Sequence, residues 1–111
     1  MVLKDLDPTA ELQLQFADGE AHTMQLTLFV AGASPNSLRA ITNITNFCES
    51  YLKDRVDLKI VDVHQQPLFA QSEQIIALPL LIKKFPEPKR RLIGDMSDTD
   101  KLISGLGLVK I

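Results

Sequence analysis

The sequence predicts an α/β domain, because its first half contains a strand, a helix and a second strand in succession. Residues 24–30, MQLTLFV, alternate apolar and polar side chains before an apolar end, which is typical of a strand entering a core. Residues 56–63, VDLKIVDV, form a second strand rich in β-branched side chains. Strand, helix and strand at this spacing indicate a right-handed crossover between parallel strands, which defines the α/β class.

The segment between these strands is predicted to be a helix over residues 35–53. Ser34 can cap the free amides of the first turn, and Pro35 suits the first helical position because it has no N–H to lose. One face of this helix is apolar, since apolar side chains recur every three or four residues at Leu38, Ile41, Ile44, Cys48, Tyr51 and Leu52.

The second half of the chain gives weaker and partly contradictory signals. PLFAQSEQII, which opens at Pro67, can form a short helix, and LPLLIKK and RRLIGDM can form two strands. This order of elements is that of the thioredoxin fold, and Pro79 falls where that fold has its cis-proline. We therefore expect Pro79 to determine the conformation of the chain at this point.

The C-terminal segment is predicted to lie between helix and strand. Ser97 with Asp100 three residues later resembles a capping box and starts a helix that runs through Ile103. Gly105 and Gly107 oppose its continuation, each by about 1 kcal/mol relative to alanine. LGLVKI can equally be a strand, so we expect these two glycines to control the conformation and alanine at both positions to favour the helix.

The N-terminal residues 1–23 are predicted to form an appendage to a domain that spans residues 24–111. They hold five acids and one lysine, which gives a net charge of -4 (one minus five). Strand spacing is present at Leu12, Leu14 and Phe16, so part of the segment can form a strand. The alternative is that the segment is disordered.

Composition narrows the possible functions. The 111 residues make a single domain with a formal net charge of -2 and one tyrosine, which argues against nucleic acid as a partner. No apolar run approaches the roughly 18 residues of a membrane span, and we expect no secretory signal because the acidic start has no apolar stretch. A single cysteine excludes an internal disulfide, so we expect a cytoplasmic protein without a membrane partner.

No catalytic or cofactor site is predicted. Thioredoxin-type exchange needs two thiols at the entry to the first helix, but the loop there, AGASPNS, has none. Cys48 lies on the apolar helix face and is expected to be a buried, inert side chain, although a one-cysteine peroxidase stays an alternative. His22 and His64 do not have the spacing of a zinc site, and AGASPNS lacks the pattern of a phosphate-binding loop.

A basic run is the strongest candidate for a binding surface. Residues 83–91 contain five cations and Glu87, a local charge of +4 (five minus one) in an acidic protein. The imbalance favours an acidic partner. The alternative is a solvated hairpin whose charges discourage pairing at a strand edge. The cations are Lys83, Lys84, Lys89, Arg90 and Arg91.

Three blocks of the sequence resemble the KaiB family of clock proteins: FVAGASPNSLRA at 29–40, VDV at 61–63 with QPL at 66–68, and residues 77–97. The resemblance continues through KLISGLGL at 101–108. It implies a non-enzymatic module that binds the ring of the RecA-like ATPase KaiC, in competition with a histidine kinase whose sensor domain has the same fold. The alternative is that this chain is itself a thioredoxin-like sensor module partnering a histidine kinase.

The same resemblance implies a conformational choice and a set of partner-binding residues. Some family members exchange a tetrameric ground-state fold for a monomeric thioredoxin-like fold, so the second half is expected in either arrangement and a homo-oligomer is expected in the ground state. The basic positions that match those used toward partners are Arg39, Lys83, Arg90 and Arg91.

Three departures identify the chain as similar to a paralogue outside the best-known oscillator. Phe29 replaces a tyrosine, Leu80 replaces a threonine, and Gly107 replaces an aspartate. The chain also lacks the acidic C-terminal tail of those members and has a longer N-terminus.

Overall fold

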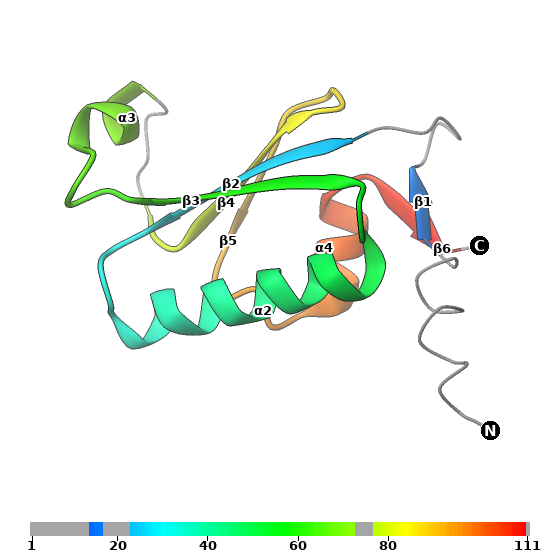
Figure 1. Ribbon diagram of the computed structural model, residues 1–111, viewed down its shortest axis with the longest axis horizontal. Coiled ribbons are helices and arrows are strands. Elements are labelled where there is room, and N and C mark those ends of the chain that lie inside the picture. Colours follow the sequence, from blue (N-terminus) through cyan, green and yellow to red (C-terminus); the bar gives the residue numbers. More distant parts are fainter. Residues whose placement is uncertain (1–13, 17–22, 73–76, 111) are drawn as a thin grey trace.

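A computed structural model describes residues 14–16, 23–72 and 77–110. Its main sheet has four strands in the order β3-β2-β4-β5, and a separate two-stranded sheet joins β1 to β6. The elements along the chain are β1 (Leu14–Phe16), β2 (Met24–Val30), α2 (Pro35–Tyr51), β3 (Val56–Asp62), α3 (Pro67–Ser72), β4 (Leu80–Phe85), β5 (Arg90–Ile93), α4 (Thr99–Gly105) and β6 (Leu108–Lys110) (Figure 1).

The predicted crossover is confirmed. β2 pairs in parallel with β3, starting at Met24 opposite Val56, and α2 connects the two strands. β4 then pairs antiparallel with β2, and β5 with β4, so that β3 and β5 are the edges of the four-stranded sheet. The second half therefore has the thioredoxin-like arrangement, one of the two that the sequence predicts.

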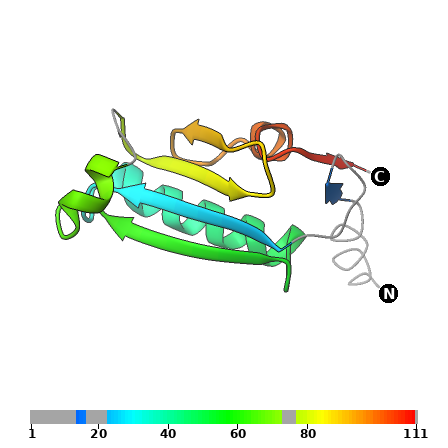
Figure 2. The same ribbon diagram turned by 90° about the horizontal axis from the view of Figure 1, so that it is seen from above.

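The core lies mainly between the sheet and the helices α2 and α4. Both helices cover one face of the sheet, which we call the helix face, whereas α3 lies on the opposite side over one end of the strands (Figures 1 and 2). Leu26, Leu28 and Leu81 point from the strands into this core and are almost fully buried. A smaller cluster on the other face contains Phe29, Val61, Leu80 and Ile82.

Helix α2 begins where the sequence predicts and ends two residues earlier. The Ser34 side chain accepts a hydrogen bond from the Ser37 amide at 3.3 Å, and Pro35 occupies the first turn. The predicted apolar face is wrong at Leu38, which is 51% exposed. The buried face is rotated slightly about the helix axis from the predicted one. It includes Ala40 and Phe47 beside Ile44 and Cys48.

The C-terminal segment forms both predicted alternatives in succession. Helix α4 ends at Gly105, and β6 follows within three residues. The predicted cap is wrong by one residue, since Asp98 caps α4 by accepting the Lys101 amide at 3.1 Å. The hydroxyl and amide of Ser97 are instead directed to the Asp95 carboxylate, the amide at 3.1 Å.

Part of the predicted N-terminal appendage is ordered against the domain. Its strand β1 pairs antiparallel with β6, with Leu14 opposite Lys110 and Phe16 opposite Leu108. Residues 1–13 and 17–22 lie outside the described residues. The pairing brings a segment near the start of the chain to one near its end.

Candidate functional site

The loop that enters α2 is held by hydroxyl groups where a thioredoxin enzyme would need thiols. The Ser37 side chain, which is almost fully buried, accepts the Ala31 amide at 3.0 Å and lies 2.9 Å from the Ser34 hydroxyl. Residues 31–37 contain no sulfur. This loop can therefore position the start of α2, but it has no group for thiol exchange.

Asp62 ties this loop to the end of β3. Its carboxylate accepts the His64 amide at 2.9 Å and the Gly32 amide at 3.1 Å. These donors, that of His64 first, lower the pKa of Asp62 because they favour the charged carboxylate. Gly32 has a φ of 58°, a left-handed conformation that glycine adopts without strain.

Cys48 is buried in the middle of α2. Burial, followed by the nearby charge of Glu49, raises the pKa of its thiol to about 12. The reactive thiolate is therefore scarce at neutral pH. Within the described part of the chain, no three histidine, cysteine or carboxylate side chains gather where they could hold a metal ion.

We expect Cys48 to react with an aromatic disulfide reagent at pH 8 only when urea unfolds the protein, because the folded state keeps the thiol buried and protonated. The rate of colour release with and without urea measures this. Insulin reduction and peroxide consumption should both be absent. Turnover in the wild type that disappears in Cys48→Ser would reveal a thiol enzyme.

Arg39 is an exposed cation that connects α2 to the loop after β5. Its side chain donates to the Asn36 side chain, and its Nε lies 3.6 Å from Asp95 Oδ2. Asn43, one turn further along α2, donates to the Asp95 carbonyl oxygen at 2.9 Å. The hydroxyl and amide of Ser97, and then the charge of Arg39, lower the pKa of Asp95.

The structure does not bring the four predicted basic residues together. Arg90 and Arg91 are exposed at the start of β5, whereas Arg39 lies beside the loop that follows the end of that strand. Pro79 follows a cis peptide bond, as predicted, and its carbonyl oxygen accepts the Gly94 amide at 3.1 Å.

The structure corrects the prediction that Lys83 is a partner-binding residue, because in this fold its side chain is not available to a partner. It is 3% exposed, and its Nζ donates to the carbonyl oxygen of Leu106 at 3.0 Å. β4 is an inner strand of the sheet, and Lys83 lies on the side of it that the end of α4 covers. A signal was present in the sequence, since Lys83 shares the strand side of the buried Leu81.

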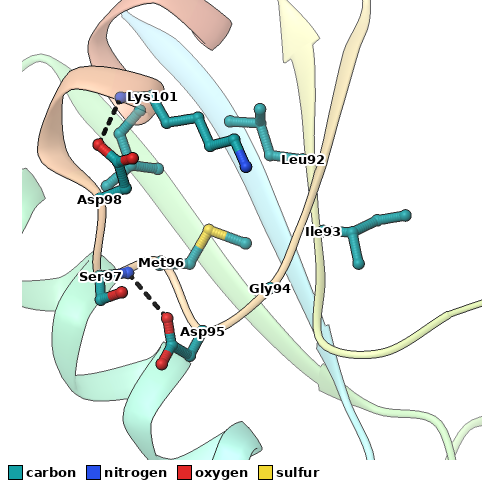
Figure 3. A pocket seen from close by; sticks show the side chains of 9 residues that line it. Leu92, Ile93, Gly94, Asp95, Met96, Ser97, Asp98 and Lys101 are labelled. Atoms are coloured by element: carbon teal, nitrogen blue, oxygen red, sulfur yellow. Dashed lines mark hydrogen bonds between the residues drawn. The ribbon is translucent and has the colours of Figure 1, made fainter.

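A cavity of about 130 Å³ lies between β5 and α4, and sequence reasoning missed it. It is open to solvent, and Figure 3 shows it bordered by the end of β5, the loop after it and the first turn of α4. All of its lining residues lie between positions 92 and 102, and the turn that folds this segment over itself has no signal in the sequence pattern. Its lining consists of Leu92, Ile93, Gly94, Asp95, Met96, Ser97, Asp98, Lys101 and Leu102.

The described residues contain no helix that is both long and apolar enough to cross a membrane.

Solved structures similar to this chain have the thioredoxin-like fold. The N-terminal domain of SasA from Synechococcus elongatus has a TM-score of 0.64 at 25% identity, over 78% of this chain and 82% of that domain. Mitochondrial thioredoxin 3 from Saccharomyces cerevisiae has a TM-score of 0.62 at 13% identity, over 93% and 86% of the two chains. At that identity the thioredoxin supports the fold alone.

The sequence comparisons identify the family. A circadian clock oscillator protein KaiB from Picosynechococcus is 44% identical over 87 residues, which are 78% of this chain and 84% of that protein. A circadian clock protein KaiB3 from Synechocystis is 44% identical over 84 residues, which are 76% and 82% of the two chains. The KaiB domain matches residues 27–108, and the chain therefore belongs to the KaiB family.

Proposed function

We propose that this chain is a non-enzymatic, cytoplasmic regulatory module that docks on the ring of a KaiC-type ATPase. The observation that supports this most is the exposed basic start of β5, formed by Arg90 and Arg91, in a chain 44% identical to clock proteins. A loop without thiols and a buried Cys48 are consistent with binding rather than catalysis. A thioredoxin-like monomer is the form that docks, and a homo-oligomer would be its resting state.

Arg90 and Arg91 are suited to an acidic surface. They are adjacent on an edge strand, so they project to opposite faces of the sheet and place positive charge on both sides of one edge. Exposed charges at the rim of an interface mainly raise the association rate and make it depend on salt. The proposed complex should therefore weaken as ionic strength rises.

Arg90→Glu together with Arg91→Glu is expected to weaken binding to a KaiC homologue by about tenfold to a hundredfold at low salt, because attraction becomes repulsion. Surface plasmon resonance at two salt concentrations measures the change. The circular dichroism spectrum should stay that of the wild type, since both side chains are exposed.

A charge-matched control is Lys53→Glu with Lys59→Glu, which changes the net charge equally near β3, the opposite edge of the sheet. This control should bind the ring nearly as well as the wild type does. If the Arg90 and Arg91 double variant binds as tightly as the wild type, this surface is not the docking face.

The second candidate is a thioredoxin-like sensor module that partners a histidine kinase. It is favoured by the similarity to the SasA N-terminal domain, at a TM-score of 0.64 and 25% identity. Co-elution from a mixture that contains both an ATPase ring and a kinase distinguishes the two proposals. A complex with the kinase alone would favour the sensor module.

A further inference from the structure

The cavity between β5 and α4 has an apolar floor beside an open strand edge. Met96 and Leu102 are almost fully buried, and Leu92 packs partly against the main core. The volume of about 130 Å³ is close to the roughly 150 Å³ of an engineered apolar cavity that binds benzene, so one branched aliphatic side chain fits. Figure 3 shows Leu92 and Met96 on this floor.

The acidic groups that line the cavity are already engaged within the fold. Asp95 accepts the Ser97 amide at 3.1 Å and lies 3.6 Å from Arg39, and Asp98 caps α4 through the Lys101 amide. The Asp95 carboxylate therefore faces Arg39, and the Asp98 carboxylate faces the first turn of α4.

Two cations lie beside the cavity. Lys101 and Arg90 are exposed, and across the described ranges neither side chain forms an ion pair. The Lys101 side chain lines the cavity and extends from α4 toward Leu92 (Figure 3). Arg90 lies two residues before Leu92 on β5 and so shares its side of the strand.

The strand next to the cavity is an edge of the sheet. The Gly94 amide points toward β4, because it donates to the Pro79 carbonyl oxygen at 3.1 Å. In an antiparallel ladder these directions alternate, so the backbone groups of Ile93 point away from β4 toward the open side. The Ile93 side chain is 56% exposed.

We propose that this edge and cavity receive an extended acidic segment of the partner, which adds a strand to β5. One aliphatic side chain of that segment enters the cavity, and neighbouring carboxylates face Lys101 and Arg90. The identity of this segment as part of an ATPase ring rests on the proposed function, whereas its chemistry rests on the cavity alone.

The test uses a short blocked peptide in which one leucine is flanked by glutamates, added to the isotope-labelled full chain. We expect amide chemical shift changes confined to residues 92–98 and 101–102. Lys101→Glu should weaken peptide binding by about tenfold, and the exposed control Lys53→Glu should leave it unchanged. A peptide with alanine in place of leucine should bind more weakly, because it leaves the cavity empty.

Absent shift changes, changes spread over the whole surface, or equal binding of the alanine peptide would each overturn the proposal. Binding of the ATPase ring separates it from the proposed function. If the ring binds and depends on Arg91 but not on Lys101, docking stands and this cavity is not used. If the peptide binds the cavity and no ring binds, the cavity stands and the proposed partner is wrong.

Discussion

Lys83→Glu is expected to cost about 3–5 kcal/mol of the free energy of unfolding, a large share of the roughly 5–15 kcal/mol that holds such a domain together. The wild-type ammonium is 3% exposed and donates to the Leu106 carbonyl oxygen at the end of α4. A carboxylate at the same place cannot form a hydrogen bond with the Leu106 carbonyl oxygen, because both groups are acceptors. It would also be a charge buried without a partner of opposite charge at that oxygen. Urea unfolding followed by circular dichroism measures the loss.

Two further variants separate charge from burial. Lys53→Glu makes the same change in charge at an exposed position and should alter the free energy of unfolding by less than about 0.5 kcal/mol. Lys83→Met keeps an aliphatic chain but donates no hydrogen bond, so its loss should be intermediate. A Lys83→Glu protein as stable as the Lys53→Glu control would mean that Lys83 is solvated in solution.

Gly107→Ala and Gly105→Ala should each destabilise this fold, in contrast to the effect expected from helix propensity. Gly107 has a φ of 76°, where alanine costs roughly 1–2 kcal/mol, and an added Cβ would lie 3.2 Å from the Lys83 Nζ. A Cβ at Gly105 would lie 2.5 Å from a methyl carbon of Leu92, an overpacking that costs about 1–3 kcal/mol. Thermal unfolding of each single variant measures the loss.

Ser104→Ala is the matched control, because it raises helix propensity at an exposed position of α4 without a new contact. It should leave the melting temperature nearly unchanged or slightly higher. If the two glycine variants behave like Ser104→Ala, the left-handed turn and the contact with Leu92 are not maintained in solution.

The first half was predictable because its signals are local. Ser34 and Pro35 mark the start of α2 within two adjacent residues, and the strands on either side carry continuous apolar patterns. These patterns remain valid whatever the rest of the chain does. The crossover could be predicted from these patterns. They also place the loop that enters α2 at residues 31–37, which contain no cysteine.

The candidate site was less predictable because it depends on contacts between distant residues. Asn43 meets the Asp95 carbonyl oxygen across 52 positions, and Lys83 meets that of Leu106 across 23. A lysine in a basic run is expected at the surface, and its contact with the end of α4 buries it. Of the basic residues predicted to form a binding surface, Arg90 and Arg91 are exposed as such a surface requires, whereas Lys83 is buried.

The pairing of β1 with β6 determines how the molecule would respond to tension. Leu14 and Lys110 form the pair nearest to the two ends of the chain, and Phe16 and Leu108 form the pair furthest from them. When the ends are drawn apart, the whole load falls on the first pair, since antiparallel strands pulled from one end separate like a zipper. The small sheet therefore opens one residue pair at a time at low force. The chain lengthens by the separated strands before any force acts on the four-stranded sheet.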